Sequence, residues 1–323
     1  MNRNQLTRHK LANSIQSMLL VGSMMLILGT LGWLLGGGAF SFLAVCIVVL
    51  LYFLNAVVSP RLILRLHRCR VLSPYEAPRL YGILQTLSRR AGLSNLPELF
   101  LIPERIPNAF TAGTSENAAI ALSEGLLDRL DARETAAVLA HEVSHIRNSD
   151  IHILRFADIS SRLTNTLSMV GQILLILNLP LFLLGRYSMS WIAILLLIFA
   201  PSISILMQLA LSRVREFNAD LGSADLMGDP EALVSALYKI EQDQRRFINR
   251  FFWPGYYREP EVSMLRTHPP TKERIRRLKE IQDRPYSPLD RSIFDLPPHT
   301  IYDHMIRGNF HSYNRPEWRL LKI

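Results

Sequence analysis

The chain has 323 residues, enough for one large domain or two of modest size. Hydrophobic residues make up 49% of it and charged residues only 20%, and the apolar residues gather in four blocks with the charge between them. The net charge of +9 lies largely beside these blocks and no nucleic-acid-binding motif is present, so nucleic acid is excluded as a partner. Two cysteines, Cys46 and Cys69, indicate no disulfide framework and fit a reducing compartment.

The first two apolar blocks cover about residues 17–35 and 40–58, joined by Gly36-Gly37-Gly38. Each is long enough to cross a bilayer as a helix, so the pair is predicted to be a transmembrane hairpin. The first block is too long for a signal peptide and no small-x-small cleavage site follows it. Basic residues flank the outer ends, which therefore face the cytoplasm: these are Arg3, Arg8 and Lys10 before the pair, and Arg61, Arg65, Arg68 and Arg70 after it.

Two further apolar blocks cover about residues 167–184 and 191–211. Pro180 and Pro201 interrupt them, so kinks are expected. The flanks again carry the positive charge, which places the linker 185–190 outside and predicts a second hairpin; the flanking residues are Arg155, Arg162, Arg213 and Arg215. The alternative is a pair of buried core helices in a soluble protein.

Between the hairpins, residues from about 72 to 160 have a globular pattern. The expected elements are a helix over 76–92, strands over 98–102 and 118–122, and a segment over 108–113 with both strand and turn character. Asp131 is a suitable N-cap for a further helix, and Glu134 follows at the spacing of a capping box. Residues from 216 to about 281 have a charged helical pattern, and the last forty or so have no clear pattern.

The capped helix carries the sequence His141-Glu142-Val143-Ser144-His145. Residues four apart lie on one face of a helix, so both imidazoles can reach one zinc ion. Glu142 is placed to take a proton from a water molecule at the metal without binding the metal itself. The alternative is a surface helix with two histidines by chance.

A catalytic zinc site needs a third protein ligand. Glu216 and Asp220 share one helical face directly after the fourth apolar block, so Glu216 could bind the metal while Asp220 holds the free ring nitrogen of a ligand histidine. An ordinary charged helix end at the membrane surface would have the same pattern. His152 and His268 are rival candidates for the third ligand.

The sequence resembles the HtpX-type membrane zinc metalloproteases, which are similar to the larger CAAX prenyl endopeptidases. The resemblance covers roughly residues 10 to 280, with the four apolar blocks in the same order. The matching segments are Asn108-Ala109-Phe110, Glu124-Gly125-Leu126-Leu127, His141-Glu142-Val143-Ser144-His145-Ile146-Arg147-Asn148-Ser149-Asp150, Ser212-Arg213-Val214-Arg215-Glu216-Phe217-Asn218-Ala219-Asp220 and Thr267-His268-Pro269-Pro270-Thr271-Lys272-Glu273-Arg274-Ile275.

The resemblance implies a mainly helical α+β gluzincin fold, with four transmembrane helices in two hairpins and a zincin-type catalytic domain with a small sheet. It implies one zinc ion held by His141, His145 and Glu216. Its other site residues are Glu142 as catalytic base, Asn148 and Asp220 as support, His268 as a group for the oxyanion or substrate carbonyl, and Asn108, Ala109 and Phe110 on an edge strand that binds substrate. His268 has an alternative role as a helix-entry residue before Pro269 and Pro270.

The expected organisation begins with a tail and first hairpin over 1–60, followed by the catalytic domain over 61–165 and the second hairpin over 166–211. The catalytic domain continues over 212–285, and a tail of unknown role covers 286–323. The expected function is a membrane-embedded zinc endopeptidase in membrane-protein quality control or stress response. Its expected location is the bacterial inner membrane, with the site facing the cytoplasm. The expected partners are peptides or misfolded membrane proteins as substrates, and the lipid bilayer. Alternatives are a prenyl-protein protease and a silent membrane scaffold with a structural zinc.

Overall fold

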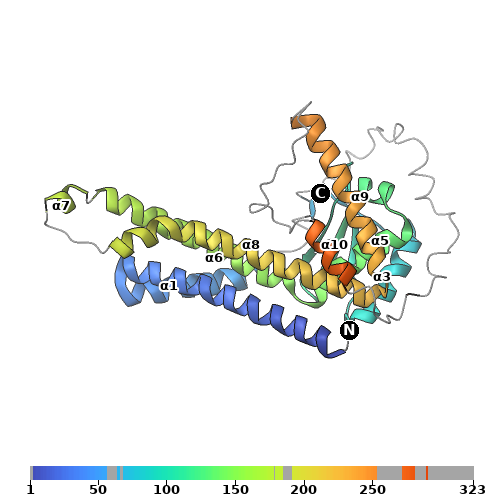
Figure 1. Ribbon diagram of the computed structural model, residues 1–323, viewed down its shortest axis with the longest axis horizontal. Coiled ribbons are helices and arrows are strands. Elements are labelled where there is room, and N and C mark those ends of the chain that lie inside the picture. Colours follow the sequence, from blue (N-terminus) through green and yellow to red (C-terminus); the bar gives the residue numbers. More distant parts are fainter. Residues whose placement is uncertain are drawn as a thin grey trace, which may run out of the picture.

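The computed structural model of the chain describes residues 3–56, 64–65, 68–177, 179–184, 191–252, 271–280 and 289. These residues form two regions, a long helical bundle and a globular body at one end of it (Figure 1). The bundle contains α1 (Arg3–Ala56), α6 (Asp150–Leu177), the short α7 (Leu179–Leu183) and most of α8 (Trp191–Met227). The chain is therefore mainly helical, as the sequence predicts.

The helix α1 is two antiparallel arms joined at the glycine link. Gly36 and Gly37 are non-helical, and Gly37 has a φ of 73°, which a residue with a side chain rarely adopts. The arms approach closely beyond the turn, because a Cβ added at Gly32 would lie 2.9 Å from the Phe40 carbonyl oxygen. Leu28 of the first arm packs on Val48 of the second. The two predicted helices are thus present as an antiparallel helical hairpin.

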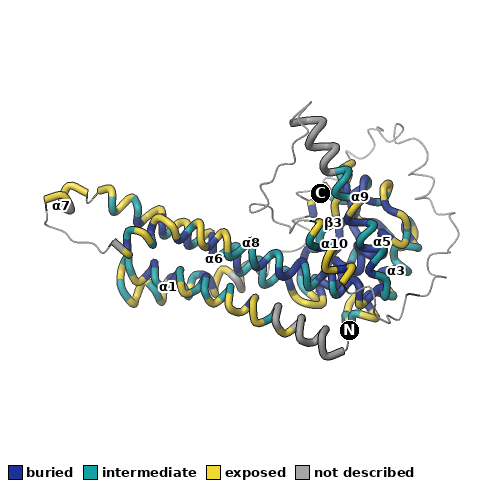
Figure 2. The backbone as a smooth tube through the Cα atoms, in the orientation of Figure 1, coloured by how far each residue is buried: buried dark blue, intermediate teal, exposed yellow. Residues whose placement is uncertain are grey.

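The helices α6 and α8 complete the bundle by packing on each other and on α1. Met24 of α1, Ala157 of α6 and Leu211 of α8 form one buried cluster where the three helices meet. Farther along, Leu31 of α1 packs against Leu197 of α8. Pro201 lies inside α8, which remains one helix through it. Many apolar residues on the outer surface of this bundle are exposed, and Figure 2 shows the exposed positions along its helices.

Two segments of the described chain are long and apolar enough to cross a membrane, Ser14–Leu51 and Ile192–Met227. The first contains both arms of the α1 hairpin. The helix α6 is not a third such segment, because polar residues including Arg162, Asn165 and Gln172 recur along it. Four spanning helices are therefore not established by these elements.

The globular body contains a small mixed sheet of strands β1 (Arg70–Val71), β2 (Glu98–Ile102), β3 (Ala109–Gly113) and β4 (Ala118–Ser123). The strand order is β1-β2-β4-β3, so β3 lies at an edge. β2 and β4 are parallel, and β1 and β3 pair antiparallel with their neighbours. One face of the sheet buries Phe100 and Ala121 in a cluster with Leu64, while Leu99 and Ile120 face the main core.

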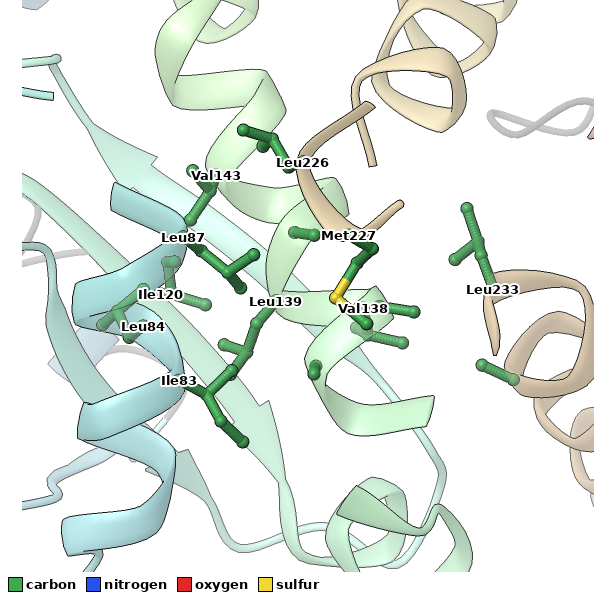
Figure 3. Close-up of a cluster of buried hydrophobic side chains, with 14 of the residues drawn as sticks. Ile83, Leu84, Leu87, Ile120, Val138, Leu139, Val143, Leu226, Met227 and Leu233 are labelled. Carbon is green, nitrogen blue, oxygen red and sulfur yellow. The ribbon is translucent and has the colours of Figure 1, made fainter. Parts of the chain in front are cut away.

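The main core lies between the sheet and the helices α3 (Pro78–Ala91), α5 (Ala132–Arg147) and α9 (Pro230–Phe252), with α10 (Thr271–Glu280) and the end of α8 closing it. Leu139 of α5 lies among Ile83 and Leu87 of α3 and Met227 at the end of α8 (Figure 3). A short helix, α4 (Glu124–Arg129), follows β4. The core thereby holds α5 rigidly between the sheet and the other helices.

The N-terminus of α5 has the predicted capping box. Asp131 Oδ1 accepts a hydrogen bond from the Glu134 amide at 2.8 Å, and Glu134 Oε2 accepts one from the Asp131 amide at 2.9 Å. The buried Glu134 carboxylate also accepts hydrogen bonds from Ser235 at 2.6 Å and Lys239 at 2.7 Å, both on α9. Helix α5 is thus fixed at its start as well as along its length.

Candidate metal centre

Three side chains from two helices converge at the centre of the body. His141 and His145 are four residues apart on α5, and Glu216 comes from α8. The His141 Nε2 atom lies 3.2 Å from His145 Nε2 and 3.4 Å from Glu216 Oε2, and His145 Nε2 lies 3.8 Å from Glu216 Oε1. Within the described chain these residues form a group that could hold a metal ion.

The spacing of these atoms suits zinc. A tetrahedral zinc ion lies about 2.0 Å from each nitrogen or oxygen ligand, which places neighbouring ligand atoms about 3.3 Å apart. The separations of 3.2 Å between the two histidine nitrogens and 3.4 Å from His141 Nε2 to Glu216 Oε2 agree with that geometry, and His145 Nε2 lies 3.8 Å from the other Glu216 oxygen. Two imidazoles and one carboxylate are also the donor set of many catalytic zinc sites, with a fourth position left for water or substrate.

Helix α8 brings Glu216 to α5 because the two helices approach closely. Gly222 lies where they touch, and a Cβ added there would fall 1.9 Å from Ser144 Oγ. Ser223 donates a hydrogen bond to the Ala137 carbonyl at 2.8 Å. Because α8 is one continuous helix from Trp191 to Met227, Glu216 lies on the same helix as the fourth apolar block.

A carboxylate and a guanidinium support His141. Asp220 Oδ1 lies 3.1 Å from His141 Nδ1, and Arg274 of α10 donates to both Asp220 oxygens at 2.8 and 2.6 Å. Arg277 stacks over the Phe217 ring at 3.7 Å and gives α10 a second contact with α8. Arg274 lies in a segment that matched the family, but the sequence alone gave it no role.

The electrostatics of this cluster favour a cation at His141. Burial alone would lower the pKa of His141, but the carboxylates of Asp220 and Glu216 outweigh it and raise the pKa to about 10. Burial would likewise lower the pKa of Arg274, but the Asp220 carboxylate outweighs burial and raises this pKa above its ordinary value. The guanidinium therefore stays charged. Buried negative charge of this kind is suited to a divalent metal.

A second carboxylate supports His145. Asp150, the first residue of α6, places Oδ2 2.7 Å from His145 Nδ1. Asn148 is the C-cap of α5, and its side chain donates to Ser144 Oγ at 3.3 Å and not to a ligand histidine. The sequence alone assigned no role to Asp150, although it ends the matching segment that begins at His141.

Glu142 faces the expected substrate strand. Its Oε2 accepts a hydrogen bond from Thr111 Oγ1 of β3 at 2.5 Å. A cavity of about 380 Å³ contains Glu142, the metal group and the strand residues Asn108, Ala109 and Phe110. Asn108 immediately precedes β3. Its amide donates a hydrogen bond to Ser123 Oγ, and its carbonyl accepts one from the Ser123 amide at the end of β4. The structure thus brings base, metal group and edge strand into one cavity.

Of the two rival candidates for a third ligand, His152 lies on α6 and is not in the group of His141, His145 and Glu216 that the described residues form. His268 lies outside the described residues, as do Pro269, Pro270 and the predicted tail 286–323 apart from Leu289.

The active-site helix, the edge strand and the His–His–Glu group together define a metallopeptidase site. The family model for peptidase family M48 matches residues 74–282, and the chain belongs to this family. A protein described as a protease HtpX homolog from Paenarthrobacter aurescens is 35% identical over 299 residues, covering 86% of this chain and 99% of that protein. A protease HtpX homolog from Salinibacter ruber is 33% identical over 285 residues, 84% and 99% of the two chains.

A further protease HtpX homolog, from Pyrococcus furiosus, is 34% identical over 269 residues, covering 78% of this chain and 90% of that protein. Among solved structures, S. mikatae Ste24p has a TM-score of 0.45 and 18% identity, covering 85% of this chain and 66% of that one. Membership of the family makes the protein a metallopeptidase, as the sequence predicts. The family and the two apolar segments together indicate a membrane protein.

Proposed function

We propose that the protein is a membrane-embedded zinc endopeptidase in which His141, His145 and Glu216 hold one zinc ion and Glu142 is the catalytic base. One observation carries the proposal: the base lies beside the metal group and hydrogen-bonds the edge strand in the same cavity. A structural zinc in a silent scaffold would have no use for a base or for an open cavity, so the proteolytic function is favoured.

The chain's own residues account for the proton transfers. Zinc bound here would polarise the scissile carbonyl and lower the pKa of a water molecule from 15.7 to about 7. Glu142 takes the proton from the attacking water and delivers it to the leaving amine. The hydroxyl of Thr111 donates to one Glu142 oxygen, which leaves the other oxygen to take the proton.

The edge strand supports binding of extended peptides. Among the described strands β3 pairs only with β4, and Asn108 together with the first strand residues Ala109 and Phe110 lines the cavity. A peptide that adds to such an edge is held by main-chain hydrogen bonds, which depend little on its side chains. This supports broad selectivity, with unfolded segments of misfolded membrane proteins as substrates in quality control or stress response.

Detergent-purified protein tests this function directly. Wild type should contain one zinc per chain and cleave casein, and a chelator should stop the cleavage. Glu142→Gln should keep the zinc and lose activity by about a hundred- to ten-thousandfold, the usual contribution of a general base. Full activity in zinc-loaded Glu142→Gln protein would refute the mechanism, and an absence of zinc in active wild type would refute the metal assignment.

We also propose that the two helix pairs cross the bilayer as hairpins with the active site on the cytoplasmic side, in the bacterial inner membrane. Support comes from the basic flanks and from the two apolar segments, whose most apolar stretches are only 11% and 22% buried within the structure. Cysteines placed at Gly37 and Ser188 should react with an impermeant reagent in intact cells, whereas one at Arg61 should not. The opposite labelling would put the site on the other side of the membrane.

A further inference from the structure

The side chain of Asp150 is fully buried and makes two strong contacts. Its Oδ2 atom lies 2.7 Å from His145 Nδ1, and its Oδ1 atom accepts a hydrogen bond from Arg215 Nε at 2.6 Å. Arg215 is only 6% exposed and also donates to the Asn148 carbonyl at 3.1 Å. A buried carboxylate is costly unless it is paired, and Arg215 supplies the pairing charge.

The contact with Asp150 decides which nitrogen of His145 can bind a metal. An ionised carboxylate accepts hydrogen bonds and donates none, so the proton must be on His145 Nδ1. The lone pair of the neutral ring is then on Nε2, the atom that lies 3.2 Å from His141 Nε2 in the metal group. Asp150 therefore fixes both the tautomer and the direction of the ring.

Arg215 and Glu216 are neighbours on α8, about 100° apart around the helix. Glu216 joins the metal group while Arg215 reaches Asp150 at the start of α6. The chain turns sharply before α6, because Ser149 has a φ of 54° directly after the C-cap of α5. Through Arg215, one turn of α8 therefore contacts both the end of α5, at the Asn148 carbonyl, and the start of α6, at Asp150.

We propose that Asp150 and Arg215 are positioning residues for His145, so that tight metal binding requires α6 and α8 to stay packed together. The inference rests on the proposed zinc site but adds residues to which the sequence gave no role. It parallels the support of His141 by Asp220 and Arg274, with one difference. The Asp220–Arg274 pair joins α8 to α10. The Asp150–Arg215 pair instead joins α6 to α8, the two helices that continue into the bundle.

Zinc affinity of the full-length protein in detergent, measured by competition with a chelator, tests the proposal. Asp150→Asn should weaken zinc binding by about ten- to a hundredfold. The matched control is Asp158→Asn, because Asp158 also lies on α6 and accepts a hydrogen bond from Gln208 of α8, at 3.3 Å, but does not contact a ligand. Asp158→Asn should keep wild-type affinity.

The absorption spectrum of the Co²⁺-loaded protein separates positioning from general stabilisation, because it reports the ligand geometry around the metal. The spectrum of folded Asp150→Asn protein should differ from wild type, whereas the spectrum of Asp158→Asn should not. Wild-type zinc affinity in folded Asp150→Asn protein, or a wild-type Co²⁺ spectrum, would overturn the proposal.

If Asp150→Asn does not fold, Arg215→Lys decides. Lysine keeps the charge but cannot bond both Asp150 and the Asn148 carbonyl in the same fork, so a smaller loss of zinc affinity is expected. Unchanged affinity would contradict the proposal. Failure of the proposed function gives a different result, because wild type itself would then bind no stoichiometric zinc.

Discussion

The globular body and the helical bundle are stabilised in different ways. The body has one continuous core in which α3, α5, α9 and the sheet bury apolar side chains, whereas the bundle has three small clusters and a largely exposed apolar surface. The body can be stabilised by the hydrophobic effect in water, whereas the bundle, in the proposed membrane-embedded protein, would depend on helix packing and on the surrounding lipid. Helix α8 runs from the bundle into the body, so one residue of the metal group lies on a helix that both regions share.

The strongest test of this comparison removes the contribution of α8 to the metal group. Glu216→Ala should lose stoichiometric zinc and with it casein cleavage, because two histidines from α5 alone do not complete the site. The loss should exceed the effect of about ten- to a hundredfold expected for a supporting residue such as Asp220. Zinc stoichiometry and turnover should be measured beside His152→Ala and His268→Ala. If Glu216→Ala keeps its zinc while His268→Ala loses it, the site must be redrawn around three histidines.

Matched leucine truncations compare the two regions directly. Leu139 in the body and Leu28 in the bundle are both fully buried. Leu139→Ala should cost about 2–5 kcal/mol of unfolding free energy, since it loses hydrophobic transfer as well as packing. Leu28→Ala should cost less, because lipid and protein interior are equally apolar and only the packing loss remains. Thermal unfolding of both variants in lipid nanodiscs measures the difference, and equal losses would remove the distinction.

A glycine pair tests the contact between α8 and α5. A Cβ at Gly222 would overlap Ser144, whereas Gly22 on α1 has no neighbouring atom within 4 Å of such a Cβ. Gly222→Ala should destabilise the protein by about 1–3 kcal/mol and weaken zinc binding, because α8 must move away from α5. Gly22→Ala should be neutral or slightly stabilising, since alanine favours the helix. Chelator competition and unfolding curves report both effects; unchanged zinc affinity in Gly222→Ala would show that the close approach is dispensable.

The smallest expected effect is a pH dependence of stability that comes from Glu134 and involves the body alone. Burial would raise the pKa of Glu134, but Lys239, Ser235 and the Asp131 amide outweigh it and lower the pKa. A carboxyl group whose folded pKa is lowered stabilises the protein above its unfolded pKa of about 4.3, and this stability is lost as the pH falls through the folded value. Glu134→Gln should therefore be less stable at neutral pH by about 1 kcal/mol. The difference from wild type should shrink in acid, and a gap that is constant with pH would contradict the assignment.

Local sequence signals predicted several elements of the body. Strand β2 has the predicted bounds 98–102, β4 extends the predicted 118–122 by one residue, and the capping box of α5 is as expected. Strand β1 was not predicted, because its two residues are too few for an alternating pattern. Helices α6 and α8 run without a break across 165/166 and 211/212, where domain limits were expected. Composition changes at those points while the helical hydrogen bonding continues.

The chemistry of the site was predictable where residues repeat at helical spacing. His141 and His145, and likewise Glu216 and Asp220, are four residues apart, so each pair shares a face. The supporting residues Asp150, Arg215 and Arg274 have no such signal. Each contacts a residue far along the chain or beyond a turn, and sequence spacing gives no information on which charged residues a fold will bury together.

The unbroken course of α8 makes the metal group sensitive to helical phase. One residue added between Leu211 and Glu216 would rotate Glu216 by about 100° and carry it past the two histidines. A full turn of added residues would nearly restore its direction but raise it by about 5.4 Å, out of reach of α5. The segment from the bundle to the site therefore has a fixed length. In the proposed membrane-spanning arrangement, a change in bilayer thickness would have to be accommodated at the end of the bundle far from the body, where α6 ends at Leu177 and α8 begins at Trp191.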